Sequence, residues 1–126
     1  MAEMQSLAAC FPVEDISETI RWYEEVLGFL ADPFPEHEPY VFAIVSRDNI
    51  EIMLQRVNDY QKPDLYRSRP GGVWDVYIRT EGVKDLYESV RNEATIVQPL
   101  RQQPYGAWEF EIKDVNGYVL AFSEME

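Results

Sequence analysis

Hydrophobic residues recur at helical spacing in two stretches of the chain, and a short apolar run precedes each stretch. The first stripe consists of Ile16, Ile20, Tyr23 and Leu27. The second consists of Val83, Leu86, Tyr87 and Val90. This periodicity is typical of helices that bury one face, and it predicts helices over residues 17–27 and 83–90. The apolar runs before them, residues 8–13 and 73–80, predict strands.

The first helix also has clear boundary signals. Asp15 can accept hydrogen bonds from the first turn, and Glu18 three residues later completes a capping-box pattern. Gly28 predicts the end of the helix because glycine adopts the left-handed conformation that commonly follows a last turn.

Segments 39–55 and 104–121 resemble each other closely. Tyr40 and Tyr105 are 65 residues apart, whereas the turn residues Asp48 and Asp114 are 66 apart. Two copies of a β-α-β-β-β pattern indicate an internal repeat, and one half of about 60 residues buries little apolar surface by itself. We therefore predict an α+β fold of two βαβββ modules, with function in a cleft between like halves.

The 126 residues are expected to form one domain. Module one should cover about residues 5–56 and module two about residues 73–124. The connecting loop, residues 57–72, carries two prolines and two glycines.

Alternation sorts the predicted strands into two faces. The more apolar set, expected to pack under the helices, is Phe42, Ile44, Trp74, Val76, Ile78, Trp108, Phe110, Ile112, Tyr118, Leu120 and Phe122. The opposite set is Met53, Gln55, Asp75, Tyr77, Arg79, Glu109, Glu111, Val119, Ala121 and Ser123. The second face is either solvated or lines a wet pocket, and the pattern does not choose between these.

Composition excludes several classes of function. The net charge of −12, from 23 acidic and 11 basic residues, disfavours nucleic acid and anionic membranes as partners. It either keeps the protein soluble or attracts a cationic ligand. The sequence has neither a membrane-spanning apolar run nor a signal-peptide pattern, and Cys10 is the single cysteine, so a cytoplasmic location is expected. Cys10 itself is expected to be a small core residue.

Two segments resemble the vicinal oxygen chelate superfamily, which includes glyoxalase I, bleomycin resistance proteins and extradiol dioxygenases. Residues 11–29, with Phe-Pro-Val-Glu-Asp followed by Arg-Trp-Tyr-Glu-Glu-Val-Leu-Gly-Phe, are similar to the family's opening segment. Residues 104–120, with Pro-Tyr-Gly and Asp-Val-Asn-Gly, are similar to its closing segment, although Val115 replaces the family's proline. The resemblance implies paired βαβββ modules whose curved sheets surround an open, barrel-like cleft, and a homodimer.

Enzymes of this superfamily hold a divalent ion on the first and last strands of each module. The resemblance places Ala8, Gln55, Asp75 and Ala121 at these positions. Alanine cannot bind a metal and glutamine is a poor ligand, so neither a metal nor another cofactor is expected. The single histidine, His37, lies in a proline-rich acidic loop and is expected to be solvated.

The candidate ligand-binding residues are polar or aromatic residues of the predicted strands and their loops. They are Gln55, Asp75, Tyr77, Tyr105, Trp108, Glu109 and Glu111. Tyr60 and Tyr66 in the connecting loop are further candidates, and a core role for Trp108 remains open. The resemblance implies a metal-free binding protein of the bleomycin resistance type, which sequesters a cationic, ring-containing small molecule in a dimer cleft. Two alternatives stay open: a glyoxalase-like lyase or isomerase that uses Glu109 or Glu111 without a metal, and a module for dimerisation or partner binding.

Overall fold

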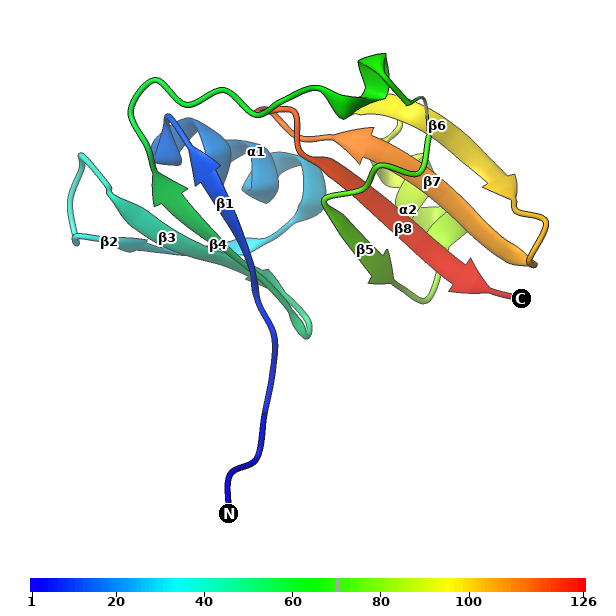
Figure 1. Ribbon diagram of the computed structural model, residues 1–126, viewed down its shortest axis with the longest axis horizontal. Coiled ribbons are helices and arrows are strands. Elements are labelled where there is room, and N and C mark those ends of the chain that lie inside the picture. Colours follow the sequence, from blue (N-terminus) through cyan, green and yellow to red (C-terminus); the bar gives the residue numbers. More distant parts are fainter. Residues whose placement is uncertain (70) are drawn as a thin grey trace. The chain divides into compact units, whose positions relative to one another are not determined.

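The computed structural model describes residues 1–69 and 71–126, which form two compact units, Met1–Tyr60 and Gln61–Glu126 (Figure 1). The boundary falls inside the predicted connecting loop, residues 57–72. Pro70 of that loop lies outside the described residues. Each unit has the element order βαβββ, so the predicted α+β fold with two such modules is confirmed.

The first unit is a four-stranded sheet with one helix. Its elements are β1 (Ala9–Val13), α1 (Ile16–Leu27), β2 (Leu30–Phe34), β3 (Phe42–Arg47) and β4 (Ile50–Arg56). The strand order is β1-β4-β3-β2, with β1 parallel to β4 and the other pairs antiparallel.

The second unit repeats this topology. Its elements are a short 3-10 helix η1 (Leu65–Arg67), β5 (Val76–Arg79), α2 (Val83–Val90), β6 (Thr95–Gln102), β7 (Ala107–Lys113) and β8 (Val119–Met125). The strand order is β5-β8-β7-β6, and β5 is parallel to β8. No helix among the described residues is long and apolar enough to cross a membrane.

The predicted boundary signals of α1 are confirmed. The Asp15 side chain accepts a hydrogen bond of 3.0 Å from the backbone N–H of Glu18. Gly28 ends the helix with a φ of 67°, in the left-handed region. The helix buries the predicted stripe against β2, β3 and β4.

In the second unit, α2 covers one face of the sheet, and the predicted sorting of residues holds on β7 and β8. Phe110 is 0% exposed and its ring lies 5.1 Å from each of the Tyr87 and Phe122 rings. Ile112 pairs with Leu120 on the same buried face. Glu109 and Glu111 consequently point to the opposite face of the sheet.

In the first unit the same prediction is wrong for β3. Ala43 and Val45 are buried under α1, whereas Phe42 and Ile44 lie on the other face, with Gln55. Cys10 is exposed, so the expectation that it is a core residue is also wrong.

The hairpin turns explain this error. Arg47 pairs with Ile50 across a two-residue turn, whereas Lys113 pairs with Val119 across five residues. The buried residues Leu54 and Phe122, which pair with the parallel first strand of each unit, are therefore 68 residues apart. On β3 itself, the buried Ala43 corresponds to Phe110, because these residues pair with Leu54 and Phe122, and the two are 67 residues apart. The spacing of 66 at the turns equates Ile44 with Phe110 instead, and a shift by one residue exchanges the two faces of a strand.

Candidate functional site

Two carboxylates lie buried on the face of the second sheet that α2 does not cover. Glu109 is 2% exposed and Glu111 is 6% exposed. Glu109 pairs with Ser123 on β8, and Glu111 pairs with Ala121. Since paired residues of neighbouring strands share a face, small β8 side chains flank both carboxylates.

Hydroxyl groups surround Glu109. Tyr77 on β5 and Tyr105, in the turn before β7, both donate to Glu109 Oε2, and the Tyr105 bond is 2.6 Å long. Ser123 Oγ lies 2.8 Å from the Tyr77 hydroxyl oxygen. Because a hydroxyl has one proton and Tyr77 gives it to Glu109, Ser123 donates to Tyr77. The result is a directed chain of hydrogen bonds that ends at one carboxylate oxygen.

Both tyrosines remain protonated at neutral pH. Burial, and then the hydrogen bond to Glu109, raise the pKa of Tyr77 above its ordinary value of 10.0. The pKa of Tyr105 is raised for the same two reasons. Although Tyr105 is exposed overall, its hydroxyl end is held at Glu109. The two phenols therefore serve as donors that stabilise a negative charge at this point.

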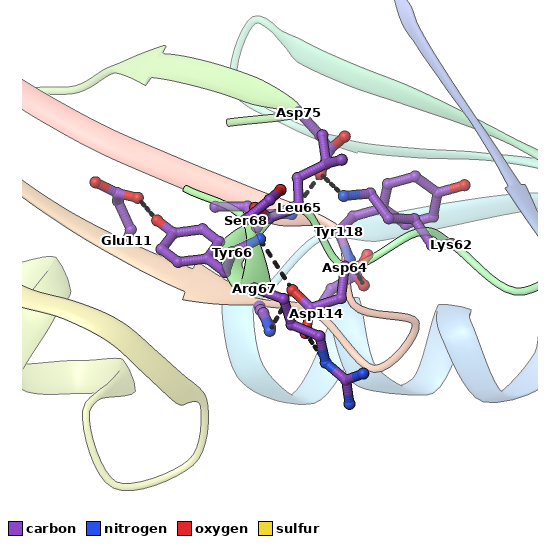
Figure 2. A network of polar contacts seen from close by, with 12 residues as sticks. Lys62, Asp64, Leu65, Tyr66, Arg67, Ser68, Asp75, Glu111, Asp114 and Tyr118 are labelled. Carbon is purple, nitrogen blue, oxygen red and sulfur yellow. Dashed lines mark hydrogen bonds and ion pairs between the residues drawn. The ribbon is translucent and has the colours of Figure 1, made fainter. Parts of the chain in front are cut away.

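Glu111 has a different donor. Tyr66, the second residue of η1, points toward Glu111 (Figure 2). Its hydroxyl donates a hydrogen bond to Glu111 Oε1. Among the described residues, neither Glu109 nor Glu111 has an ion-pair partner within 4.0 Å. The two buried negative charges are thus compensated by neutral hydroxyls.

Burial raises the pKa of the Glu111 carboxyl above its ordinary value of 4.5. The sequence predicts a raised pKa for at least one of Asp75, Glu109 and Glu111, from repulsion between like charges. The direction is confirmed for Glu111, but its cause is loss of solvation.

This shift has a consequence for stability. A raised pKa in the folded state means that the folded protein binds the proton more tightly than the unfolded chain. The resulting stabilisation is complete below pH about 4.5 and is lost as pH rises through the folded pKa.

We expect Glu111→Gln to raise the melting temperature at about pH 7 and to leave it unchanged near pH 4. Thermal unfolding at the two pH values measures this, with Glu51→Gln at an exposed strand position as the control. An equal effect of Glu111→Gln at both pH values would contradict the assignment.

Asp75 is already engaged. Its Oδ2 atom lies 3.0 Å from Lys62 Nζ (Figure 2). The same atom accepts a 2.8 Å hydrogen bond from the backbone N–H of Val119. The Lys62 side chain is only 7% exposed, which makes this a well-covered ion pair. Asp75 therefore anchors the segment before β5 rather than offering a free negative charge.

Aromatic and cationic side chains border the Glu109 cluster. The Trp74 ring lies 4.8 Å from the Tyr77 ring at an angle of 47°, and Trp74 is 40% exposed, so the expectation that it packs under a helix is wrong. The Arg79 guanidinium lies 5.5 Å from the centre of the Tyr77 ring. The electrons of an aromatic ring attract a cation at this distance, so the Tyr77 ring makes a cation–π contact with Arg79.

The structure brings together four of the seven predicted residues on one face of the second sheet, namely Tyr77, Tyr105, Glu109 and Glu111. Asp75 belongs to the same unit, but its described contacts are with Lys62 and the Val119 backbone. Trp108 alternates with Glu109 and lies on the other face, where Lys84 of α2 is 4.3 Å from its ring. Gln55 is an exposed residue of β4 in the first unit. The roles of Ser123, Lys62 and Lys113 are not evident from the sequence, although the alternation pattern does place Ser123 on the carboxylate face.

The residues at the superfamily's metal positions do not fit a divalent ion. Among the described residues, no three His, Cys, Asp or Glu side chains come together. By strand register, the counterpart of Gln55 is Ser123, which is hydrogen-bonded to Tyr77, rather than the predicted Ala121. Asp75 is committed to Lys62. A set of one paired carboxylate, an amide, a hydroxyl and an alanine lacks the charged or imidazole ligands that transition metals require.

The family model of the Glyoxalase/Bleomycin resistance protein/Dioxygenase superfamily matches residues 6–122, and the chain belongs to this superfamily. The resemblance seen in the sequence is thereby confirmed at the level of the superfamily. A search of curated proteins gives no match.

Solved structures agree on the fold. TioX from Micromonospora sp. ML1 is 20% identical, with a TM-score of 0.77 over 98% of this chain and 100% of that chain. The virulence protein STM3117 from Salmonella typhimurium is 26% identical, with a TM-score of 0.69 over the whole of both chains. A glyoxalase-related enzyme from Clostridium phytofermentans is 18% identical, with a TM-score of 0.73 over 99% of this chain and 98% of that chain. These descriptions differ, so the likeness specifies the fold and leaves the ligand open.

Proposed function

We propose that the protein is a small-molecule binding protein of the bleomycin resistance type, which holds a cationic, ring-containing ligand without a metal and without altering it. The observation that carries this proposal is the pair of buried carboxylates on one sheet face. Glu109 and Glu111 bear negative charge in a poorly solvated place, and their described partners are neutral hydroxyls. A cation bound here offsets the cost of burying that charge.

The surrounding side chains suit a ring. Trp74 and Tyr105 are 40% and 57% exposed, and both lie next to Tyr77 or its carboxylate partner. Aromatic faces contribute stacking or cation–π energy of roughly 0.5–2 kcal/mol each. A flat cationic molecule therefore finds both of its recognition elements on the second unit.

Calorimetry with bleomycin and a panel of cationic aromatic compounds tests this proposal. We expect binding that weakens as salt rises from about 0.05 to 0.5 M, because added ions screen the attraction between the carboxylates and the ligand. Neutral aromatic compounds of similar size serve as controls. Absence of binding across the whole cationic panel would overturn the proposal and leave the acidity as a property of the surface.

The raised pKa of Glu111 supports a second candidate, a lyase or isomerase in which this carboxylate exchanges protons with the substrate. The two functions differ in the fate of the ligand. Mass spectrometry of the bound compound after prolonged incubation should recover it unchanged if the protein only binds, whereas a change of mass or structure that Glu111→Gln abolishes would establish the enzyme.

A homodimer is part of the proposal. Each four-stranded sheet has strand edges with backbone groups available for pairing, and homodimers are the commonest symmetric assembly. Light scattering at micromolar concentration should give about 30 kDa, twice the 14.8 kDa of one chain. A mass near that of a single chain would exclude the dimer under those conditions.

A further inference from the structure

The segment of residues 61–69, here called the strap, lies against the carboxylate face of the second sheet. Three polar contacts attach it there. Lys62 contacts Asp75 and Tyr66 contacts Glu111, as Figure 2 shows, and Asp64 contacts Lys113 of β7. Asp64 also accepts a 3.1 Å hydrogen bond from the Tyr66 backbone N–H and so fixes the start of η1. The tyrosine is thus presented to Glu111 by a locally ordered turn.

The middle of the strap is held by polar contacts rather than by a core. None of the η1 residues is buried, and Leu65 is 49% exposed. The Lys113–Asp64 distance is 3.4 Å with side chains 24% and 42% exposed, and the Lys113 ammonium lies 5.6 Å from the Tyr66 ring. Contacts of this kind are individually weak because solvent competes for both partners.

The two carboxylates differ in how firmly their donors are held. Glu109 receives its hydrogen bonds from Tyr77, within β5, and from Tyr105, in the turn that leads into β7. Both positions are fixed by strand pairing or by a short turn. Glu111 receives its described bond from the strap. Of the two, Glu111 is therefore the carboxylate whose donor can leave without disturbing the sheet.

We infer that the Tyr66 hydroxyl occupies the position at Glu111 that the ligand's cationic group takes when the ligand binds. We further infer that this cationic group carries N–H donors, as an ammonium or amidinium does. The inference rests on the proposed function and names the chemistry of its ligand. When the ligand displaces the Tyr66 hydroxyl, the buried Glu111 carboxylate loses the hydrogen bond that Tyr66 donates. A buried carboxylate that has lost a donor needs a replacement hydrogen bond. A charge-assisted N–H bond supplies both the donor and the opposite charge, whereas a quaternary ammonium supplies only the charge.

Two matched probes test this inference: benzylammonium and benzyltrimethylammonium, each titrated by NMR into the wild-type protein and into Tyr66→Phe. The variant keeps the ring but removes the hydroxyl that the ligand displaces. We expect benzylammonium to bind Tyr66→Phe about tenfold more tightly than the wild type, and benzyltrimethylammonium to bind the two proteins equally. Tyr40→Phe, in the first unit, is the matched control and should bind like the wild type.

A second measurement follows the strap itself. Hydrogen–deuterium exchange of residues 61–69 in the wild type should rise when benzylammonium binds and stay constant with benzyltrimethylammonium. Lys113→Met, which removes two attachments of the strap and leaves the Tyr66 hydroxyl, should also tighten benzylammonium binding.

The outcomes separate this inference from the proposed function. Benzylammonium binding that is the same in Tyr66→Phe and the wild type, with unchanged exchange of the strap, would overturn the role of Tyr66 and leave the cation site standing. Equal tightening for both probes would overturn the need for N–H donors. Absence of binding by both probes to all four proteins would overturn the proposed function and this inference together.

Discussion

Glu109→Gln is expected to weaken the binding of a cationic aromatic ligand about 10- to 100-fold. Hydrogen bonds and ion pairs to a charged, buried group are worth roughly 1.5–3 kcal/mol, and about 1.4 kcal/mol corresponds to a factor of ten in affinity. Glutamine keeps the shape of the side chain. Its carbonyl oxygen can still accept the bonds from Tyr77 and Tyr105, so the sheet face is preserved while the charge is lost.

Glu51→Gln is the matched control for this measurement. It removes the same charge from an exposed position on β4 of the first unit. A loss of affinity in Glu109→Gln with little change in Glu51→Gln locates the attraction at the buried carboxylate. Equal effects of the two variants would mean that the ligand responds to net charge alone. Calorimetry at low salt provides the comparison, and circular dichroism confirms that both variants are folded.

Phe110→Ala is expected to lower the free energy of unfolding by about 3–5 kcal/mol, the range measured when a buried phenylalanine is truncated. Phe110 is fully buried on β7 between the Tyr87 ring of α2 and the Phe122 ring of β8. Its loss leaves a cavity beneath the strand that also carries Glu109 and Glu111. Denaturant titration measures the change.

Phe34→Ala is the control for this stability experiment. Phe34 ends β2 and is 63% exposed, so its truncation should change the free energy of unfolding by less than about 0.5–1 kcal/mol. If Phe110→Ala does not fold, Phe110→Leu gives a smaller loss of the same origin. A loss in Phe110→Ala no greater than in Phe34→Ala would contradict the assignment of Phe110 to the core of the second unit.

The local elements of this protein follow from its sequence. The apolar stripe that includes Ile20 and Tyr23 determines which side of α1 is buried, because a 3.6-residue period places these positions on one face. Asp15 and Gly28 determine where the helix begins and ends, through a side-chain acceptor and a left-handed backbone. The internal repeat determines the order βαβββ in each half.

Strand faces were predictable only where the register was clear. On β7 the alternation of Phe110 and Ile112 with Glu109 and Glu111 is unambiguous, and the prediction holds. On β3 every residue from Phe42 to Val45 is apolar, so alternation gives no signal there. The register then depends on the length of the hairpin turn, which differs between the halves.

The donors and counter-charges of the site were decided by tertiary structure. Alternation places Glu109 and Glu111 on one face, but their partners Tyr77 and Tyr66 lie 32 and 45 residues away along the chain. Lys62 pairs with Asp75 because the strap, to which Lys62 belongs, folds back over the sheet. Sequence thus determined that Glu109 and Glu111 share one face of β7, because the side chains of a strand alternate with a period of two residues. Burial, hydrogen-bond partners and the pKa of Glu111 depend on what distant segments cover that face, and only the folded chain decides this.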